Sequence, residues 1–506
     1  MTSDELIGRS APIAVVGAGT MGAGIAQVAA VAGHPVMVYD AVEGAAERAV
    51  AAVRDRVAGL VDKGRLTLDP AGLRLAAVTE LGELTPARCV IEAVAEDLAV
   101  KQALFADLEK VVTPGCVLAT NTSSLSPTAI AAGLSHPGRL VGLHFFNPVP
   151  VMRLVEVVSG LATDPGVAAA VTRLAEDWGK QAVQAAATPG FIVNRVARPF
   201  YGEALRLAEE QAAGPATIDA VLTQAGGFRM GPFALMDLVG QDVNEAVTRS
   251  VWAAFGYDPR FAPSLLQRAL VEAGWLGRKS GRGWYQYGDD TAPPVPDVAP
   301  GRPAPAHVTE HGESPLDTLL ARSGVVIRAG AGPGGAVQLP SGALLVRCDG
   351  RPATALAAGW DRPVVVVDRT LDDATAAGIA IAACDGCPAA AVDEAVGLLQ
   401  AAGLTVYVIG DAPGLVVTRT VAMLVNGAVD ARHKGVASAA DIDTAMRLGT
   451  NYPLGPLAWG QSWGPATVLG ILDAMQAWYG EDRYRPSALL RRIAAAGGSL
   501  VPEEGS

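Results

Sequence analysis

The chain of 506 residues lacks any apolar run close to the ~20 residues that a membrane-spanning helix needs. It also lacks a basic excess. The formal net charge is −12 and the pI is near 5.1, which argues against nucleic acid or an anionic membrane surface as the main partner. The first ten residues are polar and acidic, so we expect no signal peptide.

Cysteine is scarce as well. Five cysteines in such a length are few and odd in number, which is typical of a protein in a reducing cytoplasm. Cys384 and Cys387 form a CxxC motif, but no second pair and no nearby histidine accompany it. We therefore expect a solvent-facing turn there and no metal, with redox or metal use as the alternative.

A glycine-rich turn follows the first apolar segment. Pro12–Val16 predicts a buried strand, GAGTMG follows it, and a helix is predicted over Gly24–Ala32. His34–Tyr39 predicts a second strand, and Asp40 stands at its end. This order of strand, glycine turn, helix, strand and acid is typical of a Rossmann-type dinucleotide-binding domain.

The glycine turn and the acid together predict NAD as cofactor. The glycines permit a tight turn and a close approach to the pyrophosphate, which would lie at the helix N-terminus. Asp40 would bind the ribose hydroxyls and repel a 2′-phosphate, and no arginine follows it, so NAD is preferred over NADP. A glycine-rich turn without cofactor is the alternative. The residues of this predicted site are Gly17, Gly19, Thr20, Met21, Gly22 and Asp40.

Four polar residues stand just past predicted strands. Glu96, Asn121, Ser123 and His144 each follow an apolar run. Ligands of open parallel sheets bind beyond the carboxyl ends of the strands, so we expect these side chains to converge on one crevice. Each of them alone could equally be an ordinary turn or cap residue.

His144 has a possible acidic partner in the next predicted strand. The segment LHFFNPVPVMRLVEVV begins just before this histidine and carries Glu156 near its end. A histidine oriented by a carboxylate is suited to act as a general base near neutral pH. The alternative is a buried structural histidine beside a solvated glutamate.

A helical region and a repeat follow. We expect an α/β domain at 1–187, an all-α domain at 188–288, a linker at 289–315, a small α/β domain without a dinucleotide loop at 316–410, and a second all-α domain at 411–506. Three motifs of the first helical domain recur in order in the second, which indicates a duplication. The second copy has Thr418 where the first has Asn194, so only the first can serve the crevice.

Six segments of the chain resemble the L-3-hydroxyacyl-CoA dehydrogenase family. They are GAGTMGAGIAQ, EAVAEDLAVKQALF, ATNTSSLSPTAIA, GLHFFNPVPVMRLVEVV, TPGFIVNR and LGRKSGRGWYQY. The likeness covers Ile13–Tyr287 and returns in the C-terminal repeat. It implies oxidation of an (S)-3-hydroxyacyl-CoA to the 3-ketoacyl-CoA, with hydride passing to NAD.

The resemblance also implies roles for particular residues. His144 would take the hydroxyl proton, Glu156 would pair with it, and Ser123 and Asn194 would bind the substrate or the imidazole. The residues that the family implies as NAD contacts are Glu96, Lys101, Ser123, Asn147 and Lys279. Asn121 joins them because it stands at a strand end. Candidates for coenzyme A on the long helix after the second strand are Arg54, Arg56 and Lys63.

Several questions stay open on the sequence. The double-length form resembles enzymes acting on 3-hydroxyadipyl-CoA in phenylacetate catabolism, and also 3-hydroxybutyryl-CoA enzymes of fatty acid metabolism (β-oxidation); no hydratase domain precedes the fold, so we do not expect the bifunctional form. A sugar-acid dehydrogenase, or an NAD-holding structural or sensor protein without turnover, is the rival interpretation. In single-repeat members the helical domain is the dimer interface, so we expect an intrachain pseudo-dimer with one active site, and a homodimer through other surfaces is possible.

Overall fold

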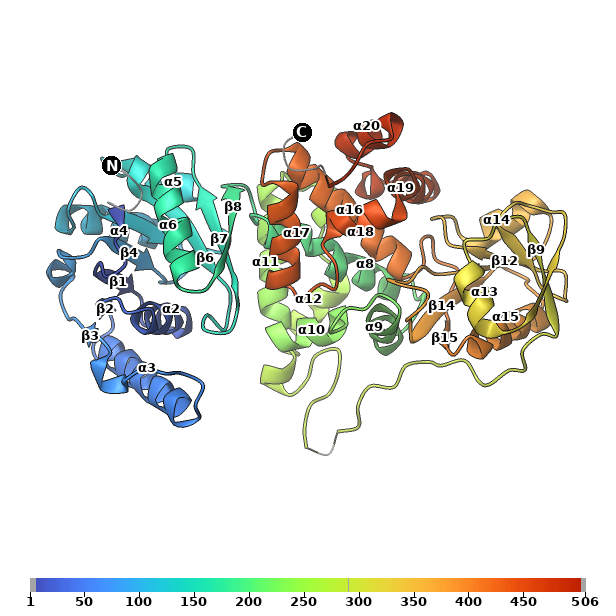
Figure 1. Ribbon diagram of the computed structural model, residues 1–506, viewed down its shortest axis with the longest axis horizontal. Coiled ribbons are helices and arrows are strands. Elements are labelled where there is room, and N and C mark those ends of the chain that lie inside the picture. The colour runs from blue at the N-terminus through green and yellow to red at the C-terminus, as the bar shows by residue number, and fades with distance from the viewer. Residues whose placement is uncertain (1–5, 290, 502–506) are drawn as a thin grey trace. The chain divides into compact units, whose positions relative to one another are not determined.

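The computed structural model describes residues 6–289 and 291–501 (Figure 1). The chain divides into two compact units. Of the described residues, the first unit contains 6–195 and 434–450, and the second contains 196–289, 291–433 and 451–501. No helix in the described ranges is long and apolar enough to cross a membrane.

The first unit is built on an eight-stranded sheet with the order β3-β2-β1-β4-β5-β6-β7-β8. All neighbouring strands are parallel except β6 and β7, which are antiparallel. This topology confirms the predicted Rossmann-type fold. The strands are β1 (Ile13–Val16), β2 (Val36–Tyr39), β3 (Leu75–Ala77), β4 (Cys89–Glu92), β5 (Val117–Thr120), β6 (Leu140–Phe145), β7 (Leu154–Ser159) and β8 (Gln181–Ala186).

Helices cover both faces of this sheet, and the strand sequences show why. Side chains alternate along a strand, so Ile13 and Val15 belong to one core cluster and Ala14 and Val16 to another. Strands buried on both faces read as continuous apolar runs, as IAVV does. The helices are α2 (Thr20–Val31), α3 (Ala45–Asp62), α4 (Leu98–Val111), α5 (Pro127–Ala131), α6 (Pro165–Asp177) and the single turn α7 (Val193–Val196).

A helix from the C-terminal repeat completes the first unit. Helix α17 (Ala439–Gly449) packs on β7 and β8, and the backbone N–H of Ala186 donates to the carbonyl of Val436. A Cβ at Gly449 would lie 2.7 Å from a methyl of Leu154 and 3.0 Å from one of Val193, so a larger residue there would force these side chains to shift.

The second unit contains a seven-stranded sheet with the order β10-β9-β11-β12-β13-β14-β15. The predicted linker over 289–315 is too long, because β9 lies inside it and pairs with β10 and β11. The strands are β9 (His307–His311), β10 (Val326–Ala329), β11 (Ala336–Gln338), β12 (Leu344–Arg347), β13 (Val364–Val367), β14 (Gly378–Ala383) and β15 (Thr405–Val408), and the helices beside them are α13 (Asp317–Ser323), α14 (Ala353–Trp360) and α15 (Ala389–Ala401).

The CxxC motif lies at the end of β14. A turn forms there, with the Cys387 N–H donating to the carbonyl of Cys384. The prediction that this turn faces solvent is wrong for Cys384, which is buried. Burial, reinforced by Cys384, raises the pKa of the Cys387 thiol to about 11, so it is no reactive thiolate at neutral pH. The described residues form no cluster of three or more possible metal ligands.

The remaining helices of the second unit come from both repeats. The first supplies α8 (Arg198–Glu209), α9 (Pro215–Gln224), α10 (Pro232–Val239), α11 (Gln241–Ala254) and α12 (Leu265–Glu272). The second supplies α16 (Val417–His433), α18 (Pro456–Trp463), α19 (Pro465–Tyr479) and α20 (Ala488–Ala496). Helix α8 packs directly on α16, and α9 packs on β14 (Figure 1).

Buried aromatic and charged side chains join the two repeats within this unit. Phe228 of the first lies 5.1 Å from Tyr452 and 5.6 Å from Trp459 of the second, between ring centroids. The fully buried Glu203 accepts hydrogen bonds from Arg483 at 3.0 Å and from the Tyr484 hydroxyl at 3.0 Å. The two repeats are thus joined by buried aromatic contacts and by a buried, hydrogen-bonded ion pair.

Candidate active site

His144 and Glu156 face each other across two antiparallel strands. The register of β6 and β7 places them directly opposite, and Nδ1 of His144 lies 2.6 Å from Oε2 of Glu156. Both side chains are buried, with 6% and 0% of each residue exposed. A charge-assisted bond of this length fixes the tautomer, so that Nδ1 carries the proton and Nε2 can accept one.

The second oxygen of Glu156 is held by the backbone. Oε1 accepts the N–H groups of Ile192 and Val193, each at 3.0 Å. Phe191 adopts a left-handed conformation with φ of 46° and thereby turns these donors inward. The carboxylate thus has no freedom to rotate away from the imidazole.

Two further predicted residues lie beside this pair. The Asn194 side-chain amide donates to the carbonyl of Ser123 at 3.3 Å. Asn121 accepts the Phe145 N–H at 2.8 Å and so ties the ends of β5 and β6 together. Hydrogen bonds thus link the loop after β5 to β6 and to α7. His144 itself lies inside β6 and not past the end of the strand as predicted.

Glu96 organises the loop that carries Ser123. Its Oε1 accepts the Thr122 hydroxyl at 2.7 Å and the backbone N–H groups of Ser123 and Ser124 at 2.9 and 3.0 Å. Burial acts to raise the pKa of Glu96, but these hydrogen bonds and the charge of Lys101 outweigh it and lower the pKa. Glu96 is therefore an anion at neutral pH and holds the loop in shape.

Lys101 has a buried partner that sequence reasoning missed. Its ammonium lies 2.6 Å from Glu92 and 3.4 Å from Glu96, and both Lys101 and Glu92 are fully buried. Glu92 also accepts the Thr120 hydroxyl and the Val94 N–H, each at 2.7 Å, so Lys101 compensates its charge and these two groups add hydrogen bonds. The available signal was a lone carboxylate inside the apolar strand CVIE.

The glycine turn between β1 and α2 fits a dinucleotide. A Cβ at Gly17 would meet the Ala93 carbonyl at 2.5 Å, and one at Gly22 would meet the Gly17 carbonyl, so both positions require glycine. A Cβ at Gly19 would meet nothing within 4 Å, and no side chain caps α2 there. The first N–H groups of this helix are therefore free to receive a phosphate.

Asp40 stands at the end of β2 next to this turn. Its Oδ2 accepts the Ala18 N–H at 2.7 Å and its Oδ1 accepts the Val42 N–H at 2.9 Å. These bonds fix the carboxylate in place while leaving lone pairs for ribose hydroxyls.

The remaining predicted contacts lie on other segments of the chain. Asn147 is exposed after β6, and Lys279 lies in the second unit, where it pairs with Asp242 at 2.6 Å. On α3, Arg54 donates to backbone carbonyls of Leu73 and Leu75. The remaining coenzyme A candidates on or just after that helix are exposed, and they are Arg56 and Lys63.

Family models match nearly the whole chain. The 3-hydroxyacyl-CoA dehydrogenase NAD binding domain matches residues 12–188, and the C-terminal domain of the same family matches twice, at 190–287 and 414–500. The 3-hydroxybutyryl-CoA dehydrogenase reduced Rossmann-fold domain matches 345–413. The last match agrees with the predicted α/β domain that lacks a dinucleotide loop.

Known proteins agree with these models. The chain is 47% identical over 488 residues to 3-hydroxyadipyl-CoA dehydrogenase of Escherichia coli, covering 95% of this chain and 97% of that protein. It is 43% identical to a probable 3-hydroxybutyryl-CoA dehydrogenase of Bacillus subtilis, covering 55% and 98%.

A solved structure matches over nearly the same length. The crystal structure of 3-hydroxybutyryl-CoA dehydrogenase from Escherichia coli superposes with a TM-score of 0.88 at 46% identity, covering 96% of this chain and 98% of that one. The chain therefore belongs to the 3-hydroxyacyl-CoA dehydrogenase family and is an NAD-dependent oxidoreductase that converts 3-hydroxyacyl-CoA thioesters to 3-ketoacyl-CoA thioesters.

Proposed function

We propose that the substrate is 3-hydroxyadipyl-CoA and that His144 is the general base. The hydrogen-bonded pair of His144 and Glu156 carries the catalytic assignment, because one imidazole nitrogen is held by the carboxylate and the other can accept a proton. The relative of the same double-repeat length supports the substrate, since it is named a 3-hydroxyadipyl-CoA dehydrogenase.

In the proposed mechanism, Nε2 of His144 takes the proton of the 3-hydroxyl group. Glu156 stabilises the imidazolium that forms, and the Ile192 and Val193 N–H groups keep the carboxylate in position. NAD, held by the glycine turn and Asp40, would supply the acceptor for the hydride that leaves C3. Ser123 and Asn194 orient the substrate oxygen toward the base, and in the reverse direction His144 returns the proton.

The cofactor and coenzyme A contacts belong to the same proposal. The glycine turn would hold the pyrophosphate and Asp40 the adenosine ribose, while Glu96 shapes the loop at the nicotinamide end. Glu96, Lys101, Asn121, Ser123, Asn147 and Lys279 stay candidates for NAD contacts. Arg54 already binds two backbone carbonyls, which leaves the exposed Arg56 and Lys63 as better candidates for the coenzyme A phosphates.

A panel of 3-ketoacyl-CoA substrates tests the substrate assignment. We expect the highest kcat/KM with 3-ketoadipyl-CoA and a lower value with acetoacetyl-CoA, measured by loss of reduced-nicotinamide absorbance. The solved Escherichia coli structure is named a 3-hydroxybutyryl-CoA dehydrogenase, which makes 3-hydroxybutyryl-CoA the second candidate. Equal or higher kcat/KM with acetoacetyl-CoA would select that candidate instead.

We also propose a cytoplasmic location and a single active site per chain. All five cysteines are free, which supports a reducing compartment. The repeats contact each other through α8 and α16, which supports an intrachain pseudo-dimer. Fractionation of the native host tests the location, and the number of NADH molecules bound per chain tests the single active site.

A further inference from the structure

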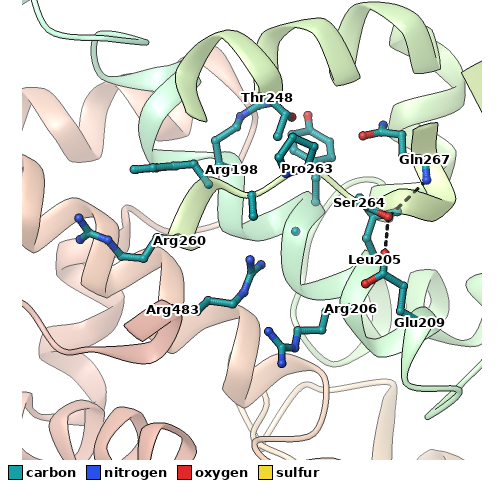
Figure 2. Close-up of a pocket in the computed structure, with 14 residues that line it drawn as sticks. Arg198, Leu205, Arg206, Glu209, Thr248, Arg260, Pro263, Ser264, Gln267 and Arg483 are labelled. Atoms are coloured by element: carbon teal, nitrogen blue, oxygen red, sulfur yellow. Dashed lines mark hydrogen bonds between the residues drawn. The ribbon is translucent and has the colours of Figure 1, made fainter. Parts of the chain in front are cut away.

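A cavity of about 150 Å³ lies in the second unit between α8, α12 and the short turns η4 (Pro259–Phe261) and η6 (Asp482–Tyr484) (Figure 2). This is about ten times the ~10–15 Å³ of such space that a cavity needs to hold one water molecule. The cavity therefore has room for a small organic ligand. The charged residues of the lining are Arg198, Arg206, Arg260, Arg483 and one carboxylate, Glu209.

Three of these arginines are compensated by carboxylates. Arg206 pairs with Glu210 and Glu481, Arg260 pairs with Asp258 and Asp430, and Arg483 pairs with Glu203. Glu209 is turned toward Ser264, whose hydroxyl donates to it at 2.6 Å (Figure 2). These groups build the walls of the cavity.

Arg198 differs from the other three. Only 7% of it is exposed, and among the described residues no carboxylate pairs with it. Its Nη1 donates to the Thr248 hydroxyl at 3.0 Å, and its guanidinium lies 4.9 Å from the Tyr201 ring centroid. Its Nε is buried with no hydrogen-bond partner.

An arginine in this setting keeps its charge. Burial lowers the pKa of Arg198, but a guanidinium remains protonated at every physiological pH. A buried charge without a counterion is costly, and a buried donor without an acceptor adds to that cost. A singly charged ligand in the cavity would relieve both, and a carboxylate matches the fork of a guanidinium.

We propose that this cavity is a carboxylate-binding site in which Arg198 supplies the charge. The carboxylate could be the far end of a dicarboxylic acyl chain or belong to a free small dicarboxylate. The first source rests on the proposed function, because 3-hydroxyadipyl-CoA ends in a carboxylate and 3-hydroxybutyryl-CoA does not.

The test uses the full-length protein and the variants Arg198→Met and Arg198→Lys. Arg268→Met is the matched control, because Arg268 lies exposed on α12 and pairs with Glu272. Methionine has a similar length without charge. If Arg198 is uncompensated in the free enzyme, Arg198→Met should keep or raise the basal Tm, whereas loss of a structural ion pair would lower it.

Two readouts separate the two sources of carboxylate. The first is the ratio of kcat/KM for 3-ketoadipyl-CoA to that for acetoacetyl-CoA, which should fall about 10- to 100-fold in Arg198→Met, the range for a lost bond to a charged group. The second is a saturable rise in Tm with free adipate, which Arg198→Met should abolish. Arg198→Lys should keep part of each effect, and Arg268→Met should keep both.

Each outcome decides between the sources. A fall in the ratio assigns the site to the acyl chain, and loss of the adipate effect with an unchanged ratio assigns it to a free dicarboxylate. If Arg198→Met changes neither, the inference is overturned. The wild-type substrate panel reports separately on the proposed function, since adipate binding does not depend on catalysis.

Discussion

The two α/β domains place a buried carboxylate against the same kind of turn, yet only one has a histidine beside it. In the first domain β6 and β7 pair His144 with Glu156. In the reduced domain the register of β13 and β14 pairs Val367 with Ile381, and the next N–H, that of Asp368, donates to the carbonyl of Ala380. Asp368 thus occupies the place of the histidine, and an alanine occupies the place of the glutamate.

The turn before the helix is retained in both. Leu415 has φ of 47° where Phe191 has 46°. Asp368 accepts the N–H groups of Val416, Val417 and Thr418 at 2.7 to 2.9 Å, as Glu156 accepts two N–H groups before α7. The comparison teaches that a buried carboxylate is enough to anchor the sheet to the turn that begins each helical repeat, whereas the proposed proton transfer needs the imidazole as well.

The largest expected effect comes from removing that imidazole. His144→Gln should lower kcat by about 10²- to 10⁴-fold, the usual range for losing general acid–base assistance, and leave the Kd of NADH near that of wild type. Single-turnover reduction of acetoacetyl-CoA and calorimetry measure the two quantities. An unchanged kcat would remove His144 from the mechanism.

Matched substitutions of the two carboxylates come next. Glu156→Gln should lower kcat about 10- to 100-fold, because the imidazolium that forms on His144 loses its stabilising anion. Asp368→Asn should leave kcat unchanged and lower the free energy of unfolding by about 1–3 kcal/mol through weakened buried hydrogen bonds. A loss of kcat in Asp368→Asn would contradict the division of roles.

Cofactor binding sharpens the contrast further. Because the reduced domain has no glycine turn, we expect one NADH per chain in calorimetry, and a stoichiometry of two would contradict this.

Asp40→Ser combined with Val42→Arg should narrow the preference for NAD over NADP, since the repelling charge is gone and a cation is added. The ratio of kcat/KM for the two cofactors measures it, with Glu43→Ser as the matched control.

The smallest effect concerns Asp219 on α9, the helix that packs on the reduced domain. Burial, partly opposed by hydrogen bonds from the Phe233 and Ala234 N–H groups, raises the pKa of Asp219 to about 6. The folded protein then holds this proton more tightly than the unfolded chain. Its contribution to stability is present below about pH 4 and is lost as the pH rises through 6.

Asp219→Asn should therefore flatten the fall in stability between pH 4 and 6. Denaturant unfolding at several pH values measures this slope. Asp372→Asn is a suitable control. The Ala374 N–H and the Thr375 hydroxyl lower the pKa of Asp372, so the contribution of this residue to stability rises with pH, whereas that of Asp219 falls. An identical slope in wild type and Asp219→Asn would show that Asp219 does not titrate in this window.

Most of the first domain could be predicted because its signals are local. Continuous apolar runs marked β1, β4 and β5, and the glycine turn marked the start of α2. The opposition of His144 and Glu156 also followed from strand order. The partnership of Lys101 with Glu92 did not, because a helical lysine reads as a solvated charge until the fold buries it.

The reduced domain was harder to predict. Strand β9 follows a proline-rich stretch, and β10 and β11 have only four and three residues, so no periodicity could develop in them. Arg198 was missed for a related reason. It stands at the start of an amphipathic helix, and only tertiary structure shows that no carboxylate in the described residues pairs with it.

The reciprocal placement of α9 and α17 affects how the specific activity depends on protein concentration. Helix α17 belongs to the second repeat yet packs on the NAD-binding sheet, and α9 belongs to the first repeat yet packs on the reduced sheet. In a homodimer such exchanged helices are lost whenever subunits separate, so activity falls at low protein concentration. Here both partners share one chain, and the specific activity should hold at nanomolar concentration.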